Sequence, residues 1–163
     1  MGYKEYKTSK KVQDMFTELG IPFTTGHAIT GVKGRLQGGK SKKTVAMIGE
    51  LDAIVCHRHP KADPMTGAAH CCGHNVQIAN LFAVAMGLQA EGVMEALGGD
   101  VVLFAVPAEE MIEVDYRNTL REKGTIKYLG GKQQLIYEGA FDDIHMAMQM
   151  HVETADTPTG EMN

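Results

Sequence analysis

The chain has 163 residues, of which 44% are hydrophobic and 22% are charged, which is ordinary for one globular domain. Its 16 lysines and arginines against 20 acidic residues give a net charge of −4, which argues against nucleic acid as the main partner. No apolar run reaches the roughly 18 residues of a membrane span, and residues 1–11 are too polar for a signal peptide. We therefore expect a soluble, cytoplasmic protein with no membrane partner.

Three cysteines make an odd count: Cys56, Cys71 and Cys72. A secreted disulfide framework would use an even set, and adjacent cysteines rarely bridge each other. Reduced thiols, or a thiolate bound to metal, are therefore the better interpretations.

Hydrophobic periodicity and helix-breaking residues predict alternating helices and strands. In the first helix, Val12, Phe16 and Leu19 recur at the i, i+4, i+7 spacing. In chain order we expect a helix over 8–20, paired short strands over 23–36, a turn over 38–43, a strand over 44–51, a loop over 53–72, a helix from 74 to 88, a short helix between 91 and 99, a strand over 100–106, a helix or lid-like excursion over 111–129, a helix over 130–138 and a strand over 144–152. This alternation indicates βαβ units and a mostly parallel sheet.

The expected helix that begins at His74 is apolar on almost every side. Only Gln77, Asn80 and the following Gln89 interrupt its apolar residues. A helix of this kind is typical of a buried element, so we expect it to be covered nearly all round.

Polar side chains that could bind a metal or transfer a proton follow the predicted strands or precede the long helix. They are Asp52, the Glu109-Glu110 pair and His151 at strand ends, and Cys72 and His74 before the helix. Because the carboxyl ends of parallel strands open into one crevice, we expect these groups to meet there.

The Cys72-Gly73-His74 step offers a thiolate and an imidazole to one metal centre. The intervening glycine relieves the backbone crowding that this arrangement demands. Alone the pattern is weak, because short Cys/His clusters arise by chance. A structural zinc finger would need a second ligand pair, for which His57 and His59 are the available residues.

The adjacent carboxylates of Glu109 and Glu110 would repel each other at the end of a buried strand. A metal ion removes this difficulty if one carboxylate binds it and the other takes a proton from its bound water, whose pKa falls to about 7. A pair of solvated glutamates is the alternative when these two residues are considered alone.

Four segments occur in the order expected for one enzyme family. They are Glu50-Leu51-Asp52-Ala53, His70-Cys71-Cys72-Gly73-His74-Asn75, Val106-Pro107-Ala108-Glu109-Glu110, and Gly139-Ala140-Phe141-Asp142-Asp143 with His151 and Pro158-Thr159-Gly160. Together they resemble motifs of the metal-dependent amidohydrolases related to aminoacylase and hippurate hydrolase, in particular the aminobenzoyl-glutamate-hydrolase-like branch.

The resemblance implies a role for each matching position. The implied ligands of two divalent ions are Cys72, His74, Glu110 and His151, with zinc the expected metal and manganese or cobalt as alternatives. Glu109 would be the general base that activates water, and Asp52 would orient a ligand or the base. Glu50 is not assigned as a ligand, and for His70 we expect a structural hydrogen bond rather than metal binding.

The resemblance also implies an α/β fold, a three-layer αβα arrangement with a mostly parallel central sheet of the zinc-peptidase type. Residues 1–163 would be the amino-terminal segment of one catalytic domain. The family's dimerisation domain and the rest of its catalytic domain are absent from this sequence, so the fold would be incomplete and the fragment alone inactive. We expect exposed apolar surface, and a homo-oligomer in the full-length protein. The excursion over 111–129 is longer and more charged than the family pattern.

Three functions compete on this sequence. The first is metal-dependent hydrolysis of an amide bond in an N-acyl amino acid or a small peptide-like substrate. The second is a non-catalytic metal-binding or interaction module, which would not need Glu109. The third makes Cys72 a thiol nucleophile with a histidine partner, although no separate orienting Asn or Asp is evident.

Overall fold

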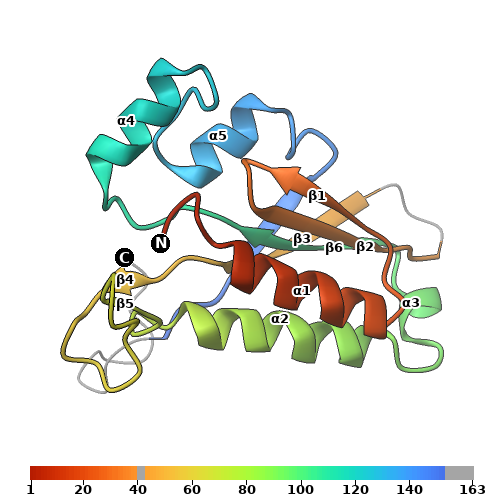
Figure 1. Cartoon of the computed structure of the whole chain (residues 1–163). Helices are drawn as coiled ribbons and strands as arrows, with labels where there is room; N and C mark the ends of the chain where they lie inside the picture. The colour runs from red at the N-terminus through yellow and green to blue at the C-terminus, as the bar shows by residue number, and fades with distance from the viewer. Residues whose placement is uncertain (40–42, 153–163) are drawn as a thin grey trace, which may run out of the picture.

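The computed structural model describes residues 1–39 and 43–152, which form a sheet with helices on both faces (Figure 1). The helices are α1 (Tyr6–Glu18), α2 (His74–Leu88), α3 (Val93–Ala96), α4 (Val114–Glu122) and α5 (Gly131–Tyr137). The strands are β1 (Phe23–His27), β2 (Gly31–Leu36), β3 (Lys43–Glu50), β4 (Ile54–Val55), β5 (Ala68–Ala69), β6 (Gly99–Val106) and β7 (Met146–Gln149). The predicted three-layer αβα arrangement is confirmed.

The main sheet has five strands in the order β1-β2-β6-β3-β7. β3 pairs in parallel with β6 and β7, whereas β2 runs antiparallel to both β1 and β6. All strands except β2 therefore point the same way, and the mostly parallel sheet is confirmed. Glu50 at the end of β3 is in register with Val106 at the end of β6. The segments that follow these strands therefore leave the sheet side by side, at the carboxyl ends of its parallel strands.

The two faces of the sheet carry separate cores. α1 and α2 cover one face, where the Phe16 and Phe82 rings lie 6.0 Å apart, while α4 and α5 cover the other (Figure 1). Leu103 and Phe104 of β6 face opposite cores, as neighbouring strand residues must. The alternating side chains of one central strand thus hold both helical layers.

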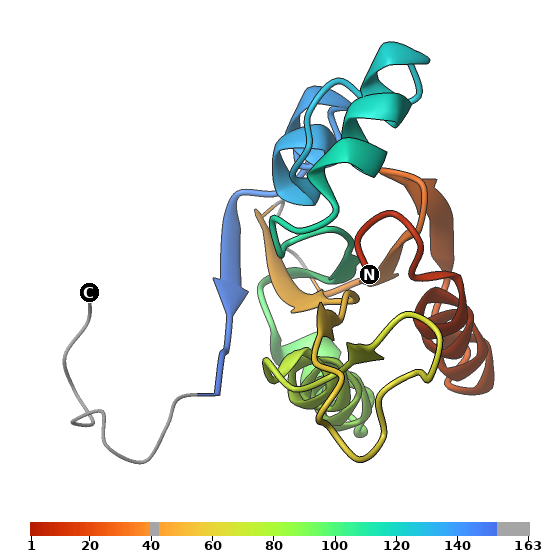
Figure 2. The same ribbon diagram turned by 60° about the vertical axis from the view of Figure 1, so that its left-hand side comes forward.

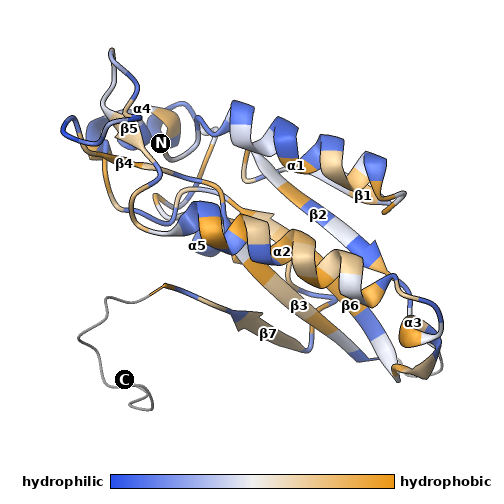
Figure 3. Ribbon diagram, turned by 90° about the horizontal axis from the view of Figure 1, so that it is seen from below, coloured by the Kyte–Doolittle hydropathy of each residue, from blue (hydrophilic) through white to orange (hydrophobic). Residues whose placement is uncertain are grey.

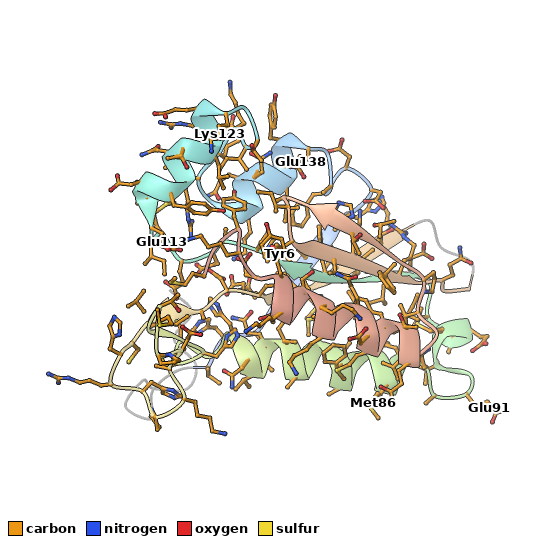
Figure 4. All side chains as sticks on the ribbon, viewed as in Figure 1. Tyr6, Met86, Glu91, Glu113, Lys123 and Glu138 are labelled. Carbon is orange, nitrogen blue, oxygen red and sulfur yellow. The ribbon has the colours of Figure 1, made fainter. Side chains whose placement is uncertain are left out.

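The prediction that α2 is covered nearly all round is wrong. Its buried residues lie on the side that faces the sheet, while Val76 and Met86 are 43% and 62% exposed. Figure 3 shows an apolar face of α2 turned away from the sheet, and Met86 points outward in Figure 4. The sequence of α2 is apolar all round, but in the described chain only one side has a partner.

Several connections differ from the prediction in detail. The expected loop over 53–72 contains a small antiparallel ladder between β4 and β5. Residues 40–42 of the expected turn, and the 158–160 part of the family resemblance, lie outside the described residues.

The expected last strand over 144–152 shortens to β7, which lies at the open edge of the sheet (Figure 2). Its Met146 and Met148 are exposed, as expected where apolar surface has no partner. Among the described residues, no helix is both long enough and apolar enough to cross a membrane.

Candidate metal centre

The polar residues singled out from the sequence gather at the edge where the parallel strands end. Asp52 follows β3, Glu109 and Glu110 follow β6, and His151 follows β7. His74 begins α2 at the same place, with Cys72 two residues before it. The parallel register of β3 with β6 and β7 therefore produces the predicted convergence.

Gly73, which precedes α2, allows His151 to come close to His74. Its φ of +101° is one that residues with a side chain rarely adopt. A Cβ at this position would lie 2.0 Å from Cγ2 of Val152, the neighbour of His151. The glycine therefore serves both the turn into the helix and the close approach of the segment after β7.

Asp52 fixes the orientation of the His74 ring, which is only 1% exposed. Nδ1 of His74 lies 3.0 Å from the backbone carbonyl of Asp52 and 3.3 Å from its carboxylate. The other carboxylate oxygen of Asp52 accepts a hydrogen bond of 2.9 Å from the backbone N–H of Glu110. Since both acceptors near Nδ1 are oxygens, Nδ1 carries a proton and Nε2 faces the site.

Nε2 of His74 is buried among carboxylates without a hydrogen-bond partner. It lies 2.9 Å from Oε2 of Glu50, an ion pair when the ring is protonated, and 3.7 and 3.9 Å from oxygens of Glu109 and Glu110. In a neutral ring this nitrogen would face only acceptor oxygens, which is costly unless a cation binds it. A cation at Nε2 would remove that cost.

Protons and cations would compete for His74. Burial alone disfavours its charged form, but the carboxylates of Asp52 and Glu50 outweigh burial and raise the pKa of His74 to about 10. The metal-free ring is therefore an imidazolium at neutral pH. A ligand must be neutral, so metal binding at this ring releases a proton.

Cys72 and His151 complete a group of three donors with His74. Sγ of Cys72 lies 3.9 Å from Nε2 of His151, and the donor atoms of all three residues lie within 4.8 Å of one another. The Glu110 carboxylate, followed by burial, raises the pKa of the Cys72 thiol to about 12. Catalytic cysteines have lowered pKa values, so this environment argues against a thiol nucleophile and favours a bound cation.

Glu109 belongs to a second group of donors, with His74 and Glu50, whose atoms also lie within 4.8 Å of one another. Burial and then the neighbouring Glu50 charge raise the pKa of the Glu109 carboxyl above its ordinary value. Its side chain remains 37% exposed, which leaves it open to a substrate. A carboxylate with a raised pKa and access to solvent is suited to accept a proton.

Glu50 is a central residue that sequence reasoning left without a role. Its buried carboxylate accepts hydrogen bonds of 2.9 Å from Gln77 and 2.7 Å from Gln149, and it pairs with Lys132. Burial raises its pKa, but His74, Lys132 and the two glutamines lower it further, so the group stays ionised. Both oxygens are engaged in these contacts, and Glu50 is at the same time a member of the second group of donors.

The remaining histidines of this region lie outside the donor groups. His57 and His59 belong to neither group among residues 1–39 and 43–152, so the zinc-finger interpretation has no support there. His70 is half-buried, and burial lowers its pKa. It joins no donor group in this part of the chain either, and its Nδ1 is buried without a partner.

The donors present fit a divalent cation. A thiol, two imidazoles and carboxylates form the mixed set that zinc accepts, and manganese or cobalt would accept its nitrogen and oxygen members. The surroundings of Nε2 of His74 are the most specific sign, because this buried nitrogen faces the carboxylates of Glu50, Glu109 and Glu110.

Known proteins are similar to this chain in sequence, although no family model matches it. Thermostable carboxypeptidase 1 of Saccharolobus solfataricus is 28% identical over 159 residues, which are 95% of this chain and 36% of that protein. IAA-amino acid hydrolase ILR1-like 5 of Arabidopsis thaliana is 33% identical over 68% of this chain and 25% of its own length. Hippurate hydrolase of Campylobacter jejuni is 27% identical over 87% of this chain and 32% of its own length.

The predicted resemblance is confirmed. These relatives are hydrolases, and the chain spans about a third of the length of the curated relatives it matches.

Solved structures agree on the fold. The YXEP protein of Bacillus subtilis, described as a dinuclear metal binding peptidase from the M20 family, aligns with a TM-score of 0.74 at 23% identity. The alignment covers 98% of this chain and 40% of that one. The aminobenzoyl-glutamate utilization protein of Klebsiella pneumoniae aligns with a TM-score of 0.65 at 18% identity, over 96% of this chain and 40% of that one.

Proposed function

We propose that this chain carries most of the metal centre of a hydrolase that cleaves the amide bond of an N-acyl amino acid or a small peptide-like substrate. The observation that carries the proposal is the convergence of the donor atoms of Cys72, His74 and His151, which lie within 4.8 Å of one another. Oxygens of Glu109 and Glu110 lie 3.7 and 3.9 Å from Nε2 of His74. Residues 1–163 would be the amino-terminal segment of a single catalytic domain.

In this proposal two divalent ions, with zinc the expected metal, are held by Cys72, His74, Glu110 and His151. Bound ions of this kind polarise a carbonyl group and lower the pKa of water. Asp52 keeps His74 oriented through Nδ1 and holds the backbone of Glu110 through its other oxygen. Asp52 therefore aligns two of the four proposed ligands, His74 through its backbone carbonyl and Glu110 through its carboxylate.

Glu109 moves the proton in the proposed reaction. Its carboxylate accepts a proton from the attacking water and then gives that proton to the departing amine nitrogen. The oxygen of the water joins the carbonyl carbon, the C–N bond breaks, and an acid and a free amine result. The raised pKa of Glu109 supports both the uptake and the return of the proton.

The names of the relatives support small substrates. They include a hippurate hydrolase and hydrolases of IAA-amino acids, whose named substrates are acyl amino acids. We propose the same class of substrate here, and a homo-oligomer as the form of the full-length protein.

The test separates metal binding from catalysis. Isothermal titration of the chain with Zn²⁺ should show binding that His74→Ala abolishes and that Glu109→Gln retains. In the full-length protein, Glu109→Gln should lower turnover of N-acyl amino acids by at least about 10²-fold, as for loss of a general base. Glu122→Gln, an exposed acid of α4, is the matched control.

Two outcomes would contradict the proposal. Absence of Zn²⁺ binding would remove its basis. Zn²⁺ binding without turnover in the full-length protein would instead indicate a non-catalytic metal-binding module, and full turnover in Glu109→Gln would refute the role of Glu109 as general base.

A further inference from the structure

The backbone that carries Glu109 and Glu110 is bounded by two strained residues. Ala108 has a φ of +53° and Glu113 has a φ of +50°, in the left-handed region that favours glycine. Residues with side chains persist in this conformation only where the surrounding structure holds them, and such strain concentrates at functional sites. The contacts that hold this segment therefore bear on the metal centre.

Both backbone groups of Ala108 are held by residues distant in sequence. Its N–H donates a hydrogen bond of 2.9 Å to Oε1 of Glu5. Its carbonyl accepts one of 2.9 Å from the N–H of Gly131 and lies 3.5 Å from Nη1 of Arg117. The strained turn is thus hydrogen-bonded to the N-terminal segment on one side and to α4 and α5 on the other.

Arg117 of α4 also holds the carbonyl of Glu110 and connects it to a third backbone segment. Nη2 donates to the Glu110 carbonyl, and Nη1 donates to the Leu129 carbonyl at 2.9 Å. Since Asp52 accepts from the N–H of Glu110, this proposed ligand has both backbone groups fixed by charged side chains.

The burial of Arg117 is unusual enough to need an explanation. The side chain is 0% exposed, and within the described residues no carboxylate lies at ion-pair distance from its guanidinium. Its other neighbour is the Tyr3 ring, whose centroid lies 5.6 Å from Cζ. A buried cation held by carbonyls and a ring, with no carboxylate beside it, is expensive. The planar fork of arginine can reach several carbonyls at once, which lysine cannot do, so its geometry rather than its charge explains its presence.

The N-terminal segment provides further contacts to this turn. Glu5 is 4% exposed, and its second oxygen accepts a hydrogen bond of 2.6 Å from Oγ1 of Thr30. Lys4 pairs at 2.8 Å with Glu113, the other strained residue. Figure 1 shows this segment between α1 and α4, and Figure 4 labels Tyr6 and Glu113 on its two sides.

We propose that Arg117 and Glu5 are positioning residues that fix the turn 108–110 and thereby hold Glu109 and Glu110 against His74. The proposal rests on the proposed function. It also assigns a role to the excursion over 111–129, which brings Arg117 to the backbone of the turn that carries Glu109 and Glu110. Neither residue contacts the donor atoms, so both act through the backbone.

The test compares Arg117→Met with Arg121→Met, an exposed arginine on the same helix. Titration of the 163-residue chain with Co²⁺, followed by its thiolate charge-transfer absorption, should show affinity reduced by about 10- to 100-fold in Arg117→Met only, as for loss of a residue that orients a ligand. Arg117→Lys should not restore the affinity, because one ammonium cannot reach the same carbonyls.

Amide hydrogen exchange of the metal-free chain gives a second and independent measurement. Exchange at Ala108, Glu110 and Gly131 should accelerate in Arg117→Met, while amides in the middle of β3 should keep wild-type rates. If the wild-type chain binds no Co²⁺, the proposed function fails, whereas this local acceleration would still support the positioning role.

Two further results decide the matter. Glu5→Ala removes the acceptor of the Ala108 N–H and so tests the same turn, with the exposed Glu18→Ala as its control. It replaces Arg117→Met in the experiment if that variant does not fold. A lower melting temperature in these variants, with exchange at 108–110 and Co²⁺ affinity both unchanged, would overturn the proposal and leave only a packing role.

Discussion

Replacement of Asp52 by asparagine tests the proposed alignment of the metal centre most directly. The two carboxylate oxygens of Asp52 face two different N–H groups, the backbone of Glu110 at 2.9 Å and Nδ1 of His74 at 3.3 Å. Asparagine offers only one oxygen, so in either orientation its NH₂ group meets a donor. The site is buried, and water cannot relieve this mismatch.

The magnitude follows from that geometry. Nδ1 of His74 would keep the backbone carbonyl as its acceptor, so the unpaired donor is the buried NH₂ group of the asparagine. One such donor costs about 1–3 kcal/mol, and Asp52→Asn should lower the free energy of unfolding by that amount. Misalignment of His74 and Glu110 should weaken Zn²⁺ binding by about 10- to 100-fold.

Urea unfolding followed by circular dichroism, and isothermal titration with Zn²⁺, measure the two effects. Asp14→Asn is the matched control, because Asp14 is exposed in its ion pair with Lys10, and its effect should stay within about 0.5 kcal/mol. Wild-type stability together with wild-type Zn²⁺ affinity in Asp52→Asn would refute the reasoning.

Three other predictions follow from the described contacts. The pKa of His74 rises from 6.5 to about 10 on folding. Protonation of this group should therefore stabilise the metal-free chain most below pH 6.5, and that stabilisation should be lost as the pH approaches 10. Urea unfolding at a series of pH values checks this, and a stability that rises with pH over this range would contradict it. Gly73→Ala places a Cβ 2.0 Å from Val152 and should weaken Zn²⁺ binding by displacing the segment after β7, with equal affinity in calorimetry as the contrary result. Phe16→Ala removes a fully buried ring that packs on Phe82 and should lower the free energy of unfolding by about 3–5 kcal/mol. Zn²⁺ affinity of the folded protein should not change. A loss of stability below about 1 kcal/mol would argue against this core.

Much of the metal centre was predictable because the proposed ligands occur in short, recognisable patterns. Cys72 and His74 lie two residues apart, and the Glu109-Glu110 pair directly follows a strand that periodicity identifies. Glu50 gave a weaker signal, an acid at the end of a buried strand. Its partners gave none, because Gln77, Lys132 and Gln149 lie 27, 82 and 99 residues away and are ordinary surface residue types.

The same limit applies to burial. The apolar face of α2 looked like that of a covered helix, yet Met86 is exposed, since coverage depends on a partner rather than on the helix. Arg117 drew no prediction, because a charged residue in a polar helix is usually solvated, yet this one is fully buried. Both cases have one cause, which is that hydropathy describes a residue and not its neighbours.

The sequence by itself determined where most of the helices and strands lie and which residues are candidates for a metal, because periodicity and motif spacing are local properties of the chain. Only the tertiary structure decided that β6 lies between β2 and β3, that Glu5 reaches Ala108 across 103 residues, and that four carboxylates surround one imidazole. The physical reason is that contacts between distant segments depend on how whole layers pack, and that packing minimises the free energy of the entire chain rather than of any one segment.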